Sequence, residues 1–196
     1  MRKKFSLLQG LGVLILVLGL GILLMQQIRI RQGIREDREN LERILDMLPE
    51  GESGIMSDYS DSEMPILQVG GKDYVCILEI PGLGVRLPVQ NQWQSDGISV
   101  RSSRFWGSIY DGTLILGGEP CEGQFDFCTQ VEVGTQVLLT DMQGTEFQLK
   151  VAKIDRSLSA AYEKLADEAY PLSLFVREKY DNRYVIVRCE WGYGNP

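Results

Sequence analysis

The sequence predicts a mostly-β domain, an antiparallel barrel or sandwich with a few short helices, behind an amino-terminal helical segment. Short runs rich in Val, Ile, Leu, Tyr and Phe recur from residue 73 onward, and Gly, Pro, Asp and Asn separate them. Helical patterns do not alternate with these runs, so the strand–helix–strand order of a parallel sheet is missing. A length of 196 residues suits one such domain plus appendages.

The composition excludes several function classes. The net charge is −7 and the chain contains no histidine. An acidic balance argues against a nucleic-acid surface, which needs a basic footprint. Without histidine the chain lacks the commonest general base and the commonest nitrogen ligand of metals. Since the cysteines are not closely paired either, we expect no metal site and no cofactor.

An apolar run over residues 7–25 predicts a single membrane anchor, with residues 1–6 as a cytoplasmic tip. At about 1.5 Å per residue a helix of this length reaches roughly 28 Å, and a bilayer core is about 30 Å thick. A cleaved signal peptide is the alternative, but the run is long for one and no small-residue cleavage site follows. Three basic residues precede the run and three follow it, so the positive-inside rule is nearly balanced: Arg2, Lys3, Lys4, Arg29, Arg31 and Arg35.

Residues 26–48 read as a helical stalk, because apolar residues recur at helical spacing among charged ones. Two heptads are too few to specify a coiled coil, so a helix lying on its own domain is favoured over a dimerising one. Residues 49–63 are rich in Gly, Ser, Asp and Glu and predict a flexible acidic linker. The folded domain then covers residues 64–196.

The domain's strands follow from local composition and alternation. Phe147, Leu149 and Val151 alternate with polar residues, as in a half-buried hairpin strand. Residues 159–169 predict a short helix. The expected strands cover residues 73–80, 85–89, 114–118, 137–140, 146–154, 172–177 and 183–190.

Several of these segments resemble, in the same order, the class B-like sortases of Gram-positive bacteria. Residues 74–89 read Tyr-Val-Cys-Ile-Leu-Glu-Ile-Pro-Gly-Leu-Gly-Val-Arg-Leu-Pro-Val, which is similar to the opening of many sortase domains. The other matching segments are residues 102–118, 140–147, 172–177 and 187–190. The resemblance implies a sortase-like closed antiparallel β-barrel, with the amino terminus inside the cell and the domain outside.

The resemblance also locates a catalytic set that this chain does not keep. In the family a cysteine attacks the substrate, a histidine moves protons and an arginine stabilises the substrate or oxyanion. The equivalent positions here are Gly118 for the histidine, Arg177 for the cysteine and Arg183 for the arginine, although an ungapped count puts Tyr184 there. Arginine is permanently charged and not nucleophilic. The resemblance therefore implies a catalytically degenerate sortase, a pseudoenzyme.

Four cysteines leave two alternatives open. Cys121 lies close to Gly118 in the sequence and is a candidate relocated nucleophile, with Glu119 as a conceivable base. The favoured alternative is a disulfide between Cys121 and Cys128, or idle thiols, in an oxidising exterior. Cys76 and Cys189 lie in strand patterns and are expected to be small buried hydrophobes.

The expected function is that of an extracellular binding module fixed in the cell membrane through residues 7–25. It would bind a sorting-signal peptide, a pilin or an active sortase during surface-protein or pilus assembly, with Arg177 and Arg183 as candidate peptide-binding residues. A simpler alternative is that Arg177 pairs with a nearby acid such as Glu178 or Asp181. The rival functions are an active cysteine transpeptidase or peptidase that uses Cys121, and a purely structural domain that caps or spaces a membrane complex.

Overall fold

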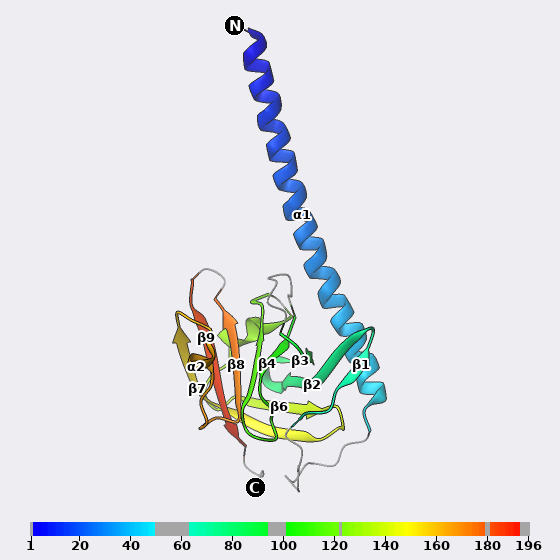
Figure 1. Ribbon diagram of the computed structural model, residues 1–196, viewed down its shortest axis with the longest axis vertical. Coiled ribbons are helices and arrows are strands. Elements are labelled where there is room, and N and C mark those ends of the chain that lie inside the picture. The colour runs from blue at the N-terminus through cyan, green and yellow to red at the C-terminus, as the bar shows by residue number, and fades with distance from the viewer. Residues whose placement is uncertain (1, 50–62, 94–100, 122, 179–180, 193–196) are drawn as a thin grey trace.

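A long helix leads into a β-barrel (Figure 1). This computed structural model describes residues 2–49, 63–93, 101–121, 123–178 and 181–192. The predicted linker over residues 49–63 lies almost entirely outside the described residues. Helix α1 (Arg2–Met47) is uninterrupted, so one helix covers both the predicted anchor and the predicted stalk.

In the described part of the chain, no helix combines the length and the hydropathy that crossing a membrane requires. The transmembrane helix predicted for residues 7–25 is therefore not found there.

The strands form one closed sheet. Its order is β1-β2-β3-β4-β5-β8-β9-β7-β6, and β6 also pairs with β2, which closes the ring while β1 stays outside it. The bounds are β1 (Leu67–Val69), β2 (Lys72–Ile80), β3 (Val85–Gln90), β4 (Ser103–Trp106), β5 (Leu114–Gly118), β6 (Gln136–Asp141), β7 (Glu146–Ser157), β8 (Leu172–Arg177) and β9 (Tyr184–Trp191). The predicted closed barrel is confirmed.

The barrel is not purely antiparallel, which corrects the prediction. β5 and β8 run parallel, and β3 meets β4 in a parallel pair at Gln90 and Ser103. A parallel pair needs a long connection instead of a tight turn. Between β5 and β8 that connection contains the whole β6–β7 hairpin, so the two strands can enter the sheet in the same direction.

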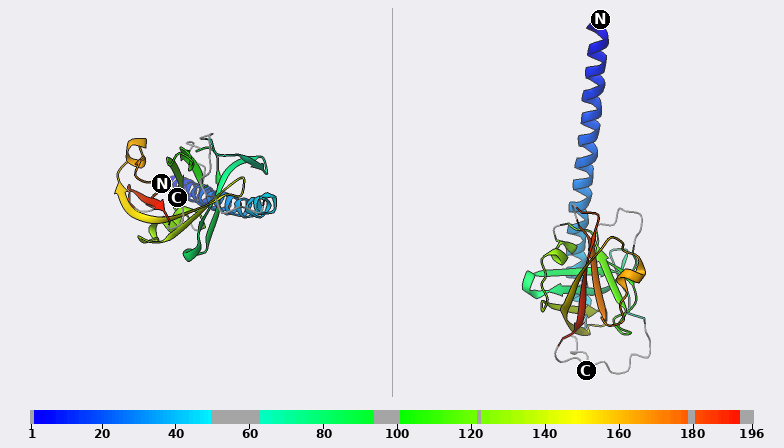
Figure 2. Two further views of the ribbon diagram at one scale, coloured as in Figure 1. Left: turned by 90° about the horizontal axis from the view of Figure 1, so that it is seen from below. Right: turned by 90° about the vertical axis from the view of Figure 1, so that its left-hand side faces the viewer.

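The main core fills the barrel. Phe147, Leu149 and Val151 of β7 are buried while the residues between them are partly exposed, which is the predicted alternation. The 3-10 helix η2 (Phe125–Thr129) adds Phe125, Phe127 and Cys128 to this core. Figures 1 and 2 show η2, in light green, toward the barrel end from which the amino-terminal half of α1 extends.

The other helices are short. The 3-10 helix η1 (Pro81–Leu83) turns β2 into β3. The helix expected over residues 159–169 is smaller than predicted, since α2 covers only Tyr162–Leu165. Its backbone leaves the helical region at Ala166, and Leu165 alone is buried, so packing supports a single turn.

The carboxyl-terminal part of α1 packs on the outside of the barrel, beside β1, β2 and β3 (Figure 1). Ile44 is fully buried there in a cluster with Val69, Tyr74, Ile77 and Met142. The helix thus lies on its own domain, and Ile44 is not free to form a coiled-coil seam.

Candidate functional site

Strands β5, β8 and β9 bring the three family-equivalent positions to one end of the barrel. Gly118 ends β5 and pairs with Val176 of β8. Arg177, which follows Val176, pairs with Tyr184 of β9. Arg183 directly precedes Tyr184. The parallel register of β5 and β8 makes the ends of both strands coincide, although a long stretch of chain separates them. The sequence positions predicted to form one site therefore lie together.

Gly118 leaves no room for a histidine. A Cβ atom at this position would lie 2.7 Å from Cδ2 of Phe125, a distance that real Cβ atoms essentially never show. Phe125 is fully buried and its ring packs against Phe127, with 5.1 Å between the ring centroids. The space in which an imidazole would start is thus occupied by an aromatic ring of the barrel core.

Arg177 and Arg183 are held by the residues of the turn between β8 and β9. Nη2 of Arg177 donates to Oδ1 of Asn182 at 2.7 Å, and Nε of Arg183 lies 2.8 Å from Oδ2 of Asp181. Both acids suggested as partners of Arg177 pair with other arginines: Glu178 with Arg156 at 3.2 Å, and Asp181 with Arg183. Exposed contacts of this kind are worth little, so a ligand can displace them.

A cluster of aromatic rings covers the outer face of β5 next to this end. Gly117 has no side chain, and a Cβ there would lie 2.5 Å from Phe175 and 2.8 Å from Trp93. Ring centroids are 5.3 Å apart for Trp93 and Phe175, 5.3 Å for Phe105 and Phe175, and 5.8 Å for Trp93 and Phe105. Trp93 was not among the site residues predicted from the sequence. The Gly117–Gly118 pair was the available signal, since glycine in a strand marks a close approach.

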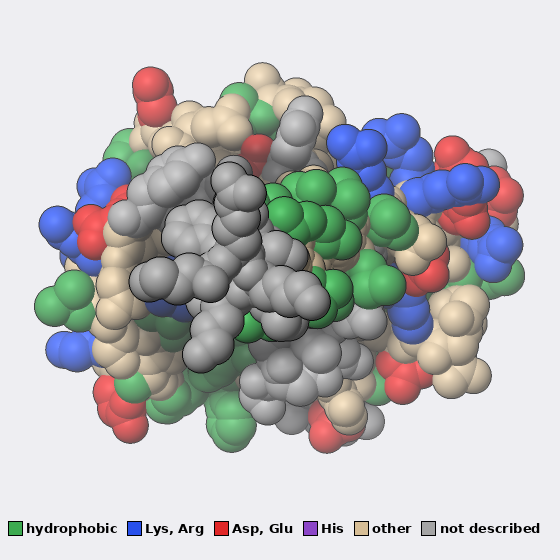
Figure 3. Space-filling model, turned by 90° about the horizontal axis from the view of Figure 1, so that it is seen from above, with side chains coloured by type: hydrophobic (Ala, Val, Ile, Leu, Met, Phe, Trp, Pro, Cys, Tyr) green, Lys and Arg blue, Asp and Glu red, His purple; other side chains and the backbone are tan. Residues whose placement is uncertain are grey.

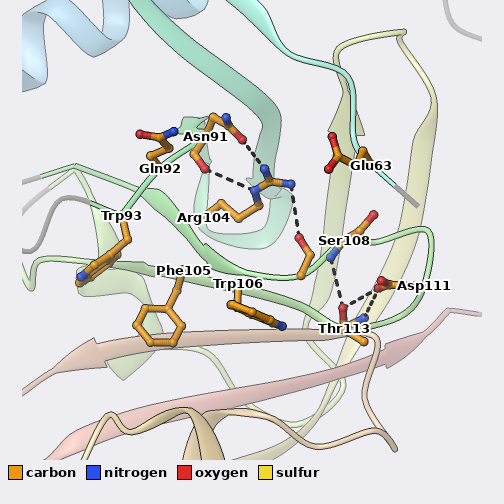
Figure 4. Close-up of a pocket in the computed structure, with 11 residues that line it drawn as sticks. Glu63, Asn91, Gln92, Trp93, Arg104, Phe105, Trp106, Ser108, Asp111 and Thr113 are labelled. Atoms are coloured by element: carbon orange, nitrogen blue, oxygen red, sulfur yellow. Dashed lines mark hydrogen bonds between the residues drawn. The ribbon is translucent and has the colours of Figure 1, made fainter. Parts of the chain in front are cut away.

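Beside this cluster lies an open cavity of about 550 Å³ (Figure 4). Its aromatic walls are Trp93, Phe105 and Trp106, and Trp106 is 56% exposed. The polar groups that line it include Asn91, Gln92, Arg104, Asp111, Thr113 and Glu63. A concave surface with aromatic walls and a few polar groups is typical of a ligand site.

Hydrogen bonds fix Arg104 at the cavity wall. Its guanidinium donates to the side-chain and backbone oxygens of Asn91 and to the backbone oxygen of Gly107 (Figure 4). On the other side, the ring of Trp106 stands at an angle of 66° to Tyr162 of α2, with 5.3 Å between centroids. The cavity therefore has a polar wall fixed by hydrogen bonds and an aromatic rim, Trp106, that packs against α2.

Cys121 is poorly suited to nucleophilic attack. Burial, together with the nearby carboxylates of Glu119 and Asp126, raises the pKa of its thiol to about 11. A cysteine nucleophile acts as the thiolate, which needs a lowered pKa. The environment of Cys121 therefore favours an idle thiol over a relocated nucleophile.

The suggested disulfide between Cys121 and Cys128 is not formed, because all four cysteines are free thiols. The reason is that η2 turns Cys128 into the barrel core while Cys121 stays half-buried in the connection before it. Cys76 and Cys189 are fully buried, as predicted, and burial raises the pKa of both. Within the described residues, no three acidic or cysteine side chains are placed to hold a metal ion.

Comparisons with known proteins agree on the fold. No protein-family model and no curated protein sequence matches the chain. Among solved structures, sortase A from Corynebacterium diphtheriae matches with a TM-score of 0.53 at 15% identity, over 85% of this chain and 86% of that one. Sortase C-3 from Streptococcus pneumoniae matches with a TM-score of 0.54 at 14% identity, over 86% and 84%.

A sortase D5 transpeptidase from Clostridium perfringens is also similar, with a TM-score of 0.53 at 12% identity, over 83% of this chain and 93% of that one. These three structures are sortases of types A, C and D, and the class B-like character remains a prediction. The closed barrel, the order of its strands and these similarities identify the chain as a protein with the sortase fold.

Proposed function

We propose that this sortase-fold protein is a non-catalytic module that binds an extended peptide, of the sorting-signal or pilin type, in surface-protein or pilus assembly. One observation carries the proposal. The positions equivalent to the family's histidine and cysteine hold Gly118 and Arg177, yet an open aromatic cavity reaches Trp93, whose ring packs over Gly117 next to Gly118.

The residues at the three family-equivalent positions, Gly118, Arg177 and Arg183, do not supply the groups that catalysis needs. Acyl transfer needs a nucleophile and a proton carrier that titrates near neutral pH. Arg177 supplies no nucleophile, and a chain without histidine lacks the usual carrier. Loss of a single member of such a set costs several powers of ten in rate.

The cavity supports a binding role. Exposed aromatic side chains combine a large apolar area with little conformational entropy, so they dominate many binding interfaces. Trp93 links the cavity to the barrel end, because its ring packs over Gly117, one residue from Gly118. A peptide that crosses this surface would pass from Trp106 over Trp93 toward Arg177 and Arg183, where guanidinium groups can donate hydrogen bonds to a carboxylate or to carbonyl oxygens.

The proposed location is the outer face of the cell membrane, with the amino terminus inside. Support comes from the amino-terminal half of α1, where Leu11, Val13, Ile15, Leu16 and Met25 are each more than 55% exposed. Seen from above, hydrophobic side chains gather to the right of the grey area in the middle of the view, and charged side chains lie mostly toward the edges (Figure 3). An exposed apolar surface of this kind is unfavourable in water, and insertion into a lipid bilayer would bury it. Recovery of the chain in the soluble fraction after cell lysis would contradict the anchor.

The alternative function is a transpeptidase or peptidase that uses Cys121. The raised pKa of the Cys121 thiol argues against this function. Intact-mass spectrometry of the protein and the peptides tests it. Incubation of the reduced protein with sorting-signal peptides and an amine should leave both masses unchanged. A covalent adduct that disappears in Cys121→Ala would establish the enzyme and overturn the binding-only role.

Binding is tested with the full chain in mild detergent, titrated with a pool of sorting-signal peptides while tryptophan fluorescence is recorded. Trp106→Ala should weaken binding about 5–30-fold, the loss expected for an aromatic anchor. Val133→Ala is the matched control, because Val133 is also an exposed apolar residue, at 67%, and does not line the cavity. Equal affinity of the two variants, or no binding by the unaltered chain, would contradict the proposal.

A further inference from the structure

The carboxyl-terminal part of α1 is joined to the barrel by a polar cluster, here called the latch cluster: Glu36, Asp37, Lys72, Arg101 and Gln124. Asp37 and Gln124 are buried, whereas Glu36 is exposed. Oε2 of Glu36 accepts from Nζ of Lys72 at 2.7 Å and from Nη2 of Arg101 at 2.6 Å. Nη1 of Arg101 lies 3.5 Å from Oδ1 of Asp37. Asp37 is only 4% exposed, so a carboxyl group is buried in a contact between helix and barrel.

Gln124 connects this cluster to the segment that covers the barrel end. Its Nε2 donates to Oδ2 of Asp37 at 3.0 Å, while its Oε1 accepts from the backbone N–H of Ser102 at 3.2 Å. Gln124 is 1% exposed and directly precedes Phe125, the residue whose ring fills the space in front of Gly118. A chain of direct contacts therefore leads from α1 to the family-equivalent histidine position.

A second part of the contact, built from Asn40, Tyr74 and Ile44, fixes the helix farther along. Nδ2 of Asn40 donates to the hydroxyl of Tyr74 at 2.9 Å, and Ile44 is fully buried beside Tyr74. Gly70 lets Asn40 approach, since a Cβ there would lie 2.8 Å from its Oδ1. The helix thus docks in one defined position.

The latch cluster is incompletely satisfied. Oδ1 of Asp37 and Nη1 of Arg101 are buried without a hydrogen bond. Burying charges with imperfect pairing costs free energy that well-packed apolar groups would not cost. The pairing of Asp37 with Arg101 therefore stabilises the docked helix less than apolar packing would. A weakly stabilised contact of this kind can open and close.

We propose that the carboxyl-terminal part of α1 is a latch, in which Asp37 and Gln124 hold η2 closed against Gly118 and release of the helix frees this end of the barrel. The proposal rests on the proposed function, since it assigns a control to the same peptide site. In the closed state Phe125 stays packed against Gly118. In the open state η2 can move away and alter the surface on which Trp93 and Phe175 lie.

The latch depends on pH through Asp37. The groups that face this carboxyl are Arg101, Gln124, Tyr74 and Cys121 of the barrel and Glu36 of its own helix. Burial raises the pKa of Asp37 from 3.8 to about 6, against the opposing effects of Arg101 and Gln124. Docking is then tightest below about pH 4 and weakens as the pH rises through 6, by up to about 100-fold in the docking equilibrium.

Hydrogen exchange followed by mass spectrometry tests the latch on the full chain in mild detergent without peptide, with rates corrected for intrinsic pH dependence. Asp37→Ala removes the acceptor of Gln124 and should speed exchange at least tenfold in both residues 36–47 and residues 124–131. Asp37→Asn keeps an acceptor without the charge, so its exchange should no longer depend on pH between 4 and 8. Glu42→Ala is the matched control, an exposed acid on the same helix, and should change neither segment.

Faster exchange in residues 36–47 alone would overturn the coupling to η2, and unchanged exchange in both segments would overturn the latch. If the latch controls the peptide site, Asp37→Ala should also change peptide affinity at least threefold, and unchanged affinity would overturn that control. Failure of every variant to bind peptide would instead contradict the proposed function, while the exchange rates still decide the latch.

Discussion

Phe125 stands directly in front of Gly118: a Cβ atom at residue 118 would lie 2.7 Å from Cδ2 of the ring and 2.8 Å from Cγ. Gly118 and Phe125 therefore pack as a pair: the ring of Phe125 fills the space that a side chain at residue 118 would need. A histidine at position 118 would therefore require repacking of the barrel core around Phe125, and not only a change of one residue.

Gly118→Ala should destabilise the protein by about 1–3 kcal/mol, because overpacking forces neighbouring side chains to shift. Urea unfolding measures the change. Gly82→Ala is the control, since Gly82 has no atom within 4 Å of an added Cβ and should cost far less.

A double-mutant cycle tests whether Phe125 is the cause. Phe125→Ala alone should cost about 3–5 kcal/mol as a core truncation. In the double variant the added Cβ of residue 118 has room, so the combined cost should fall below the sum by at least about 0.5 kcal/mol. Strict additivity would mean that the two residues do not share this space.

Arg188 should be the most sensitive arginine of the domain. It is 4% exposed, and its guanidinium donates to Oγ of Ser173 at 2.8 Å and to the backbone oxygens of Lys164 and Leu165. Arg188→Ala leaves the buried oxygens of Ser173 and Leu165 unpaired and should cost about 2–4 kcal/mol. Arg183→Ala, at an exposed position, should change the free energy of unfolding by less than about 0.5 kcal/mol, and a reversed order would contradict the structure.

Cys121 should react slowly with iodoacetamide. With a pKa of about 11, its thiolate fraction at pH 8 is about 100-fold smaller than that of an ordinary cysteine. Mass spectrometry should find little labelling of the native protein at pH 8, and four labels after unfolding. Fast labelling of Cys121 would revive the relocated nucleophile.

The stability of the native protein should fall as the pH rises through the pKa of Asp37. Because the folded pKa of about 6 lies above the unfolded value of 3.8, Asp37 contributes most below pH 4, and the contribution is lost above pH 6. The loss amounts to about 3 kcal/mol at most. Asp37→Asn should therefore raise the melting temperature at pH 8 and change it little at pH 4. Parallel pH profiles for the two proteins would exclude Asp37 as the group responsible.

The peptide surface should respond to Gly117. A Cβ there would meet both Phe175 and Trp93, so Gly117→Ala must displace at least one ring. Displacing Trp93 should shift its fluorescence and weaken peptide binding several-fold, whereas Gly82→Ala should do neither. Unchanged fluorescence would show that Trp93 does not lie against β5.

The sequence by itself determined the local elements of this protein. The alternation of Phe147, Leu149 and Val151 depends only on neighbours along one strand, so it predicted β7 correctly. The ordered motifs that resemble sortases predicted the closed barrel. They also predicted that Gly118, Arg177 and Arg183 lie at one end of it. Burial of Cys76 and Cys189 followed in the same way from their strand patterns.

Only the tertiary structure decided what surrounds those residues. The parallel pairing of β5 with β8, the ring of Phe125 against Gly118 and the contact of Asp37 with Gln124 all join segments far apart in the chain. Of the two alternatives for Cys121 and Cys128, a disulfide or idle thiols, the structure has free thiols, because packing of η2 into the core determines where Cys128 points. Local patterns report which side of a strand or helix is buried, whereas the partner on that side is chosen by packing of the whole barrel.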